Sequence, residues 1–113
     1  MNNNLKLVID NSFLDNNKKF FEKEKLKIIL DLYAKKVSLG DWKDYGLSIS
    51  NRQVGFSVFK NTAESAMYKI CKNFKPTNKN FKYLVTDSMG KIYNNSHSLK
   101  NLISNTNWKN LKK

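Results

Sequence analysis

The spacing of apolar residues changes twice along this chain, and those changes constrain its fold more than any other feature. From about Glu22 to Leu39 the spacing is helical. From residue 42 to about residue 93 it is two, which is typical of half-buried strands. After Ser96 the helical spacing returns. The residues that carry the first stripe are Leu26, Ile29, Leu30, Tyr33 and Val37.

Polar turns divide the middle region into four or five short strands. The alternating apolar residues of the first four are Tyr45, Leu47 and Ile49; Val54, Phe56 and Val58; Tyr68 and Ile70; and Phe81, Tyr83 and Val85. Lys91-Ile92-Tyr93 makes a short last strand. Strands joined by such short connections pair as antiparallel neighbours. The sequence therefore predicts an α+β fold: a helix, a four- to five-stranded antiparallel β-meander and a C-terminal helix.

Turn and capping residues refine this prediction at the C-terminal end. Asp87-Ser88-Met89-Gly90 has the Asp-first, Gly-fourth pattern of a β-turn. We expect Ser96 to cap the last helix. Leu99, Leu102 and Ile103 should form its buried stripe, with Trp108 and Leu111 docking the tail.

The 113 residues fit one domain. We expect residues 1–20 to form an N-terminal arm with a short strand at Leu5, Leu7 and Ile9, and residues 21–113 to form a single α+β domain. One cysteine makes no internal disulfide, and no Cys/His cluster suits zinc. A secretory signal and a bilayer-spanning segment are both missing from the sequence. These features predict a cytoplasmic protein that does not bind membranes.

Positive charge is concentrated in the second half of the chain. The net charge is +12, of which residues 1–56 carry +3 and residues 57–113 carry +9. Such a surplus usually indicates a polyanionic partner. An AT-rich genome would also enrich Lys and Asn, and 20 of the 21 basic residues are Lys. Codon bias does not explain why only Glu64 and Asp87 are acidic after residue 56, so the asymmetry favours a real electrostatic surface.

Residues suited to catalysis are few. Nucleophilic triads need Ser or Cys beside His with an acid behind it, but His97 is the only histidine and is better explained as a structural or capping residue. Asp41 and Asp44 flank Trp42 as a turn device would. We find no phosphate-binding loop, metal-ligand spacing or cofactor fingerprint. The sequence therefore predicts a non-enzymatic protein without metal or cofactor.

Several stretches resemble a family of small, basic bacterial proteins of the alphaproteobacterial type, known only as a domain of unknown function. They are Leu30-Asp31-Leu32-Tyr33, Gly40-Asp41-Trp42-Lys43-Asp44-Tyr45, Phe56-Ser57-Val58-Phe59, Tyr68-Lys69-Ile70, and His97 with Leu99. The likeness covers about residues 20–104. This chain departs from the family pattern at Ser96, where the family has Gly, at Cys71, where it has a carboxylate, and in using Lys for Arg. The resemblance implies that basicity belongs to the family, and it implies no activity.

A basic sheet surface suits nucleic acid, because lysines neutralise phosphates and aromatic rings stack on bases. We expect Lys69 and Lys82 to share an exposed face with Ser57 and Phe59. The near-absence of Arg argues against sequence-specific major-groove contacts. A single-stranded partner is favoured, since a meander followed by a helix is also used by single-strand binders of the Whirly and Pur type. The predicted nucleic-acid-binding residues are Arg52, Phe59, Lys60, Lys69, Lys72, Lys75, Lys79, Lys82 and Lys91.

The alternative is a protein–protein adaptor or regulatory protein whose charge serves solubility only. Exposed or half-exposed apolar residues would form its docking patch. Trp42, Phe59, Met67, Leu84 and Trp108 are the candidates. A free sheet edge could also pair two copies into a homodimer.

Overall fold

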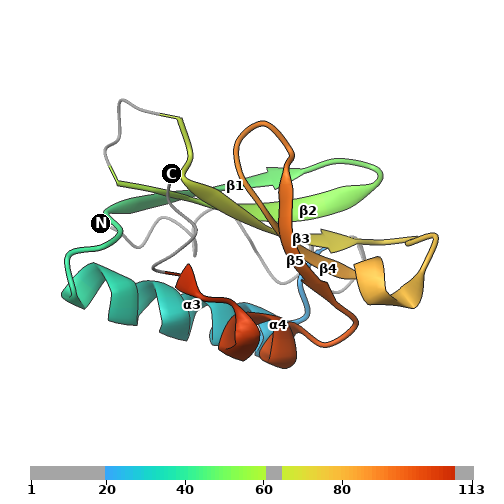
Figure 1. The fold of residues 1–113 in the computed structure, drawn as a ribbon, viewed down its shortest axis with the longest axis horizontal. Coiled ribbons are helices and arrows are strands. Elements are labelled where there is room, and N and C mark those ends of the chain that lie inside the picture. The colour runs from blue at the N-terminus through green and yellow to red at the C-terminus, as the bar shows by residue number, and fades with distance from the viewer. Residues whose placement is uncertain (1–19, 61–64, 109–113) are drawn as a thin grey trace.

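The computed structural model describes residues 20–60 and 65–108, and these form two helices on one five-stranded sheet (Figure 1). Helix α3 spans Lys23–Ser38 and helix α4 spans Leu99–Asn105. The strands are β1 (Asp44–Ile49), β2 (Gln53–Phe59), β3 (Tyr68–Asn73), β4 (Tyr83–Thr86) and β5 (Ile92–Ser96). A short 3₁₀ helix, η1 (Lys79–Phe81), precedes β4.

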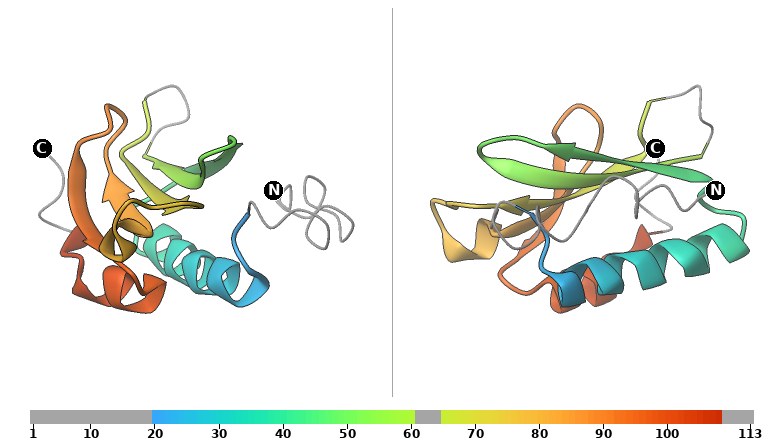
Figure 2. Two further views of the ribbon diagram at one scale, coloured as in Figure 1. Left: turned by 90° about the vertical axis from the view of Figure 1, so that its right-hand side faces the viewer. Right: turned by 180° about the vertical axis from the view of Figure 1, so that it is seen from behind.

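All neighbouring strands pair antiparallel, in the order β1-β2-β3-β4-β5. The predicted α+β meander between two helices is therefore confirmed, with five strands. Both helices lie on the same side of the sheet, as the two further views show (Figure 2).

The core lies between the sheet and the helices. Register places Val54, Phe56 and Val58 of β2 beside Lys72, Ile70 and Tyr68 of β3. Ile29 of α3 and Leu99 and Leu102 of α4 are fully buried, in the same cluster as these strand residues. Apolar burial of this kind contributes about 25 cal/mol per Å² removed from water, so the alternating strands and the helical stripes stabilise each other.

Phe20 and Phe21 are also core residues, 3 % and 1 % exposed. The backbone carbonyl of Phe20 accepts a hydrogen bond of 2.9 Å from the Lys72 ammonium. The packed domain thus includes Phe20, a residue predicted to belong to the N-terminal arm. The strand predicted at Leu5, Leu7 and Ile9 lies outside the described residues, as does Leu111.

The stripe of α3 differs from the prediction at its C-terminal end. Ile29 is buried, but Val37 is 40 % exposed. Lys36, seven residues after Ile29, takes the inward position instead, and its side chain is only 13 % exposed. Long lysine stems pack well against apolar surface, so the stripe ends in an amphipathic residue.

Two boundaries at the C-terminal end were predicted wrongly. Strand β5 continues to Ser96, and the cap of α4 is Ser98, whose Oγ accepts from the Asn101 amide at 3.3 Å. His97, between them, is exposed. The β-turn after β4 is confirmed: Asp87 Oδ1 accepts from the Met89 and Lys91 amides, both at 2.9 Å, and Gly90 supplies the positive φ of 92°.

Candidate functional site

Two hollows lie at opposite ends of strands β1, β2 and β3, and together they contain three of the nine predicted binding residues. One is formed by the β1–β2 turn and the β3–β4 connection. The other lies where β1 begins and β2 ends, beside the C-terminal end of α3. The first is the basic loop surface, defined as Asn51, Arg52, Asn73, Lys75, Pro76, Thr77 and Phe81. The second is the aromatic hollow, defined as Lys36, Asp41, Trp42, Lys60, Met67, Tyr68 and Trp108.

The basic loop surface combines cations with an accessible aromatic ring. Arg52 and Lys75 border a hollow of about 380 Å³ together with Phe81, which is 40 % exposed. Lys79 lies in η1, two residues before Phe81, and is exposed as well. The sequence predicted a strand at Phe81. Its place in a 3₁₀ turn instead turns the ring outward from the core.

Side-chain hydrogen bonds hold this surface in shape. Asn73 Nδ2 donates to the carbonyl of Phe81 at 2.7 Å, and Gln53 Nε2 donates to Asn73 Oδ1 at 2.8 Å. The amide of Phe74 donates to the carbonyl of Arg52 at 2.9 Å. The side chain of Asn78 accepts from the Asn80 amide and so caps η1. The two loops are therefore tied to each other, and their cations extend from a fixed backbone.

Carboxylates are rare in this part of the chain. Between Asp44 and Asp87 the sequence contains one acidic residue, Glu64. Within the described residues of β1, β2, β3 and β4 beyond Asp44 there is therefore no negative side chain to pair with the cations of the loops. Such a surface attracts anions over a distance of about 8–10 Å at physiological salt.

Lys69 and Phe59 lie on the sheet face opposite the helices. Ser57 pairs with Lys69 across β2 and β3, and Phe59 lies two residues from Ser57 on β2. The alkyl chain of Lys69 packs over Gly55, where a Cβ would approach its Cδ to 2.9 Å. The expected grouping of Lys69 with Ser57 and Phe59 is thus present, although all three side chains are only partly exposed.

Lys82 does not join this group. Its ammonium lies 5.6 Å from the centroid of the buried ring of Tyr83, a residue that pairs with Lys72 on the core side of the sheet. The backbone of Lys82 has φ −62° and ψ −42°, which is helical, so strand alternation begins only at Tyr83. In addition, Lys69 pairs with Thr86, the last residue of β4, whereas Lys82 precedes the first residue of that strand. The prediction of one shared face for both lysines was therefore wrong.

Lys72 lies on the core side of β3 and is 8 % exposed. Its ammonium donates to the carbonyl of Phe20. Burial lowers the pKa of Lys72, and the nearby Glu22 carboxylate partly opposes that decrease. The alternation of Tyr68, Ile70 and Lys72 would have revealed this inward position. The structure thus removes Lys72 from the accessible surface.

The remaining predicted residues lie apart from the basic loop surface. Lys60 follows β2 and borders the aromatic hollow. Lys91 belongs to the β4–β5 turn, where its ammonium lies 5.3 Å from the Tyr93 ring centroid. The hydrogen bonds from the Lys91 and Met89 amides lower the pKa of Asp87 in that turn. The nine residues therefore divide among several surfaces, and only Arg52 and Lys75 border the same hollow.

The aromatic hollow has a volume of about 250 Å³. The rings of Trp42 and Trp108 meet edge to face, with centroids 5.5 Å apart. Trp42 is 4 % exposed, whereas Trp108 is half-buried and donates from Nε1 to the carbonyl of Ile103 at 3.3 Å. The predicted docking of Trp108 is confirmed. Sequence reasoning missed this hollow, because its residues come from four segments that only folding brings together.

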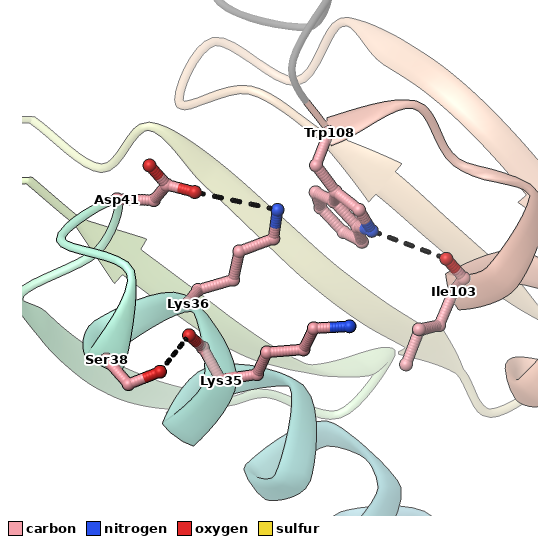
Figure 3. Close-up of polar contacts among 6 residues, drawn as sticks. All are labelled: Lys35, Lys36, Ser38, Asp41, Ile103 and Trp108. Carbon is pink, nitrogen blue, oxygen red and sulfur yellow. Dashed lines mark hydrogen bonds and ion pairs between the residues drawn. The ribbon is translucent and has the colours of Figure 1, made fainter.

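Lys36 enters the aromatic hollow from α3 (Figure 3). Its Nζ lies 3.7 Å from Asp41 Oδ2, which is an ion pair but exceeds the distance of a hydrogen bond. Figure 3 shows the Lys36 ammonium directed toward Asp41, with the Trp108 indole on the other side. Asp44, the other carboxylate near Trp42, accepts from the Tyr45 amide at 2.8 Å, as a turn residue does.

Nucleophilic and metal-binding groups do not gather in the described part of the chain. Cys71 is 1 % exposed, and burial raises the pKa of its thiol, which disfavours the reactive thiolate. Across residues 20–60 and 65–108, no group of three or more His, Cys, Asp or Glu residues could hold a metal ion. Over the same ranges, both helices are too short and too polar to cross a membrane.

The architecture defines a small α+β domain in which two helices cover one face of an antiparallel meander. A family model described as "Protein of unknown function (DUF2794)" matches residues 19–103. This match covers most of the chain, and the chain belongs to that family. No curated protein and no solved structure matches it significantly.

Proposed function

We propose that this protein is a non-enzymatic module that binds single-stranded nucleic acid with weak sequence preference, through the basic loop surface. The observation that carries the proposal is the position of an exposed ring, Phe81, beside Arg52 and Lys75. Aromatic stacking is tolerant of base identity and is worth about 1–3 kcal/mol per base. Cations beside the ring would neutralise the phosphates that flank a stacked base.

Two further features support the same surface. Asn51 and Asn73 border it, and amide side chains can hydrogen-bond to base edges or phosphates. The nearest stretch of sequence has almost no carboxylates to repel a polyanion. The ring and the cations lie on two short turns. A nucleic acid that binds them therefore does not need the geometry of a duplex. A cytoplasmic location and a homodimer formed through the free edge of β1 or β5 belong to the same proposal.

Fluorescence anisotropy tests the proposal with fluorescein-labelled single-stranded DNA, single-stranded RNA and a duplex of the same sequence, at low and at physiological salt. We expect the single strands to bind more tightly than about 10⁻⁴ M at low salt, and to weaken as salt rises. Failure to reach that affinity at low salt would refute nucleic-acid binding. Tighter binding of the duplex would refute the preference for single strands.

A charge-reversal pair tests the location. Arg52→Glu with Lys75→Glu should weaken binding at least about tenfold, because two phosphate contacts become repulsive. The matched control is Lys23→Glu with Lys100→Glu, which changes the net charge equally on exposed helix positions. Equal losses in both double variants would mean that net charge alone, and not the basic loop surface, attracts the oligonucleotide.

The second candidate is a protein-binding adaptor, which one observation favours. Met89, in the β4–β5 turn, is 89 % exposed, and Ile92, at the start of the edge strand β5, is 47 % exposed. Exposed apolar residues beside a free sheet edge are suited to docking another chain. If the oligonucleotides do not bind, sedimentation analysis of Met89→Ser with Ile92→Thr should show whether this edge mediates self-association.

A further inference from the structure

Two residues that border the aromatic hollow have polar groups without a hydrogen-bond partner in the described part of the chain. Within residues 20–60 and 65–108, Tyr68 Oη is the buried side-chain atom without a hydrogen-bond partner. Tyr68 borders the hollow and is 3 % exposed. The hydroxyl of the neighbouring Tyr93 donates instead to Asp87 Oδ2, at 3.5 Å. Leaving a buried hydroxyl without a hydrogen-bond partner is unfavourable, and a ligand that bonds to it would remove that cost.

Lys36 is the second group of this kind. Its side chain is 13 % exposed, and Asp41 approaches its Nζ only to 3.7 Å. The described part of the chain therefore offers no hydrogen-bond acceptor to the three N–H donors of this ammonium. Ammonium groups strongly favour hydrogen-bonded partners when water is excluded. The position of Lys36 is well suited to bind an anion that enters the hollow.

Charge and shape together specify the chemistry of the occupant. Lys36 and Lys60 outnumber Asp41 among the bordering residues, so the hollow has a net positive charge. Its apolar walls are Trp42, Trp108 and Met67. A flat ring would pack against these walls, while an attached anionic group would meet the ammonium. A volume of about 250 Å³ is at the small end of ligand pockets, which limits the occupant to one or two rings.

We infer that the aromatic hollow binds a small aromatic carboxylate, with the ring against Trp42 and Trp108 and the carboxylate beside Lys36. The hydroxyl of Tyr68 supplies a further hydrogen bond. This site is separate from the basic loop surface, because the two lie at opposite ends of β1, β2 and β3. The inference therefore goes beyond the proposed nucleic-acid binding and does not depend on it.

The test uses benzoate as probe and ¹H–¹⁵N NMR of the full chain as readout. Trp42 and Trp108 are the only two tryptophans, so both indole N–H resonances report on the hollow. We expect benzoate to shift both resonances saturably, with a Kd of about 1 mM or tighter. Benzyl alcohol should bind at least about tenfold more weakly, because it lacks the charge.

Three outcomes of this titration would overturn the inference. The first is the absence of a saturable shift with benzoate. The second is equal binding of benzyl alcohol, which would remove the role of Lys36. The third is an equal effect of inorganic phosphate, which would assign the hollow to simple anions and remove the role of the two indoles.

Paired variants test the residues. Lys36→Met keeps a long apolar stem and should weaken benzoate binding about tenfold or more, whereas Lys43→Met, at an exposed position outside the hollow, should not. Should Lys36→Met fail to fold, Tyr68→Phe serves, with Tyr93→Phe as its control. We expect Tyr68→Phe to stay folded and to weaken binding about fivefold. Unchanged affinity in a folded Lys36→Met or in Tyr68→Phe would refute the role assigned to that residue.

Discussion

The two ends of the sheet use lysine in opposite ways. At the basic loop surface, Arg52 and Lys75 extend from turns whose backbone is already held by Asn73. In the aromatic hollow, Lys36 reaches inward beside two indoles, with an ion pair at 3.7 Å as its nearest partner. Water can hydrogen-bond to the cations of the basic loop surface at almost no cost in free energy. The side chain of Lys36 is mostly buried, and its ammonium therefore depends on neighbouring groups for its hydrogen bonds. The first end therefore suits a long polyanion, and the second suits a small molecule.

The largest expected difference between the two ends is in stability. Trp42 is 4 % exposed and packs in the core, whereas Phe81 is 40 % exposed. Trp42→Ala should lower the free energy of unfolding by about 3–5 kcal/mol, and Phe81→Ala should lower it by less than about 1 kcal/mol. Urea denaturation measures both. Similar costs for the two variants would show that Phe81 is a core residue and would weaken its assignment as a stacking platform.

Salt dependence should separate the two ends next. Each phosphate contact contributes about 0.7 to the slope of log affinity against log salt for a single strand. Arg52→Ala and Lys75→Ala should each reduce the slope by about that amount and the affinity by about threefold to tenfold. Lys60→Ala, which removes a cation of the aromatic hollow, should change the slope by less. A larger effect at Lys60 than at Arg52 would move the proposed interface to the other end of the sheet.

Periodicity predicted the architecture because a helix and a half-buried strand place apolar residues at different intervals. It worked least well where long polar side chains replace apolar ones. Lys36 and Lys72 occupy inward positions at the correct spacing, seven residues after Ile29 and two after Ile70. A sequence reading that assigns every lysine to solvent overlooks them, because their alkyl stems pack like apolar residues.

The candidate site was less predictable than the fold for a related reason. The residues of the aromatic hollow come from the end of α3, the segment before β1, the end of β2 with the start of β3, and the segment after α4. Spacing along the chain carries no information on which of these meet. Lys82 illustrates the same limit at short range. The direction of its side chain was predicted from strand alternation, but its backbone is helical at the end of η1, so the alternation does not extend to it.

A pH titration of stability tests the buried lysine. Burial lowers the pKa of Lys72 in the folded protein below its usual value of 10.5. Between the lowered pKa and 10.5 the unfolded chain binds more protons than the folded one, so this residue makes stability rise with pH in that window. The free energy of unfolding of the wild type should therefore increase relative to that of Lys72→Met as pH increases from 7 to about 9.5, by about 1 kcal/mol or less. Parallel curves for the two proteins would mean that burial does not lower the pKa of Lys72.

The smallest effect should come from the unpartnered hydroxyl of the aromatic hollow. Tyr68 Oη has no hydrogen-bond partner within residues 20–60 and 65–108, and burial raises its pKa. Tyr68→Phe removes a polar atom that the protein does not satisfy, so the free energy of unfolding without ligand should stay the same or rise by up to about 1 kcal/mol. Tyr93→Phe, which removes a long 3.5 Å contact to Asp87, should lower it slightly. Thermal denaturation of the three proteins compares them. A clear loss of stability in Tyr68→Phe would show that the hydroxyl is already satisfied in the free protein, and the aromatic hollow would then offer a ligand only the ammonium of Lys36.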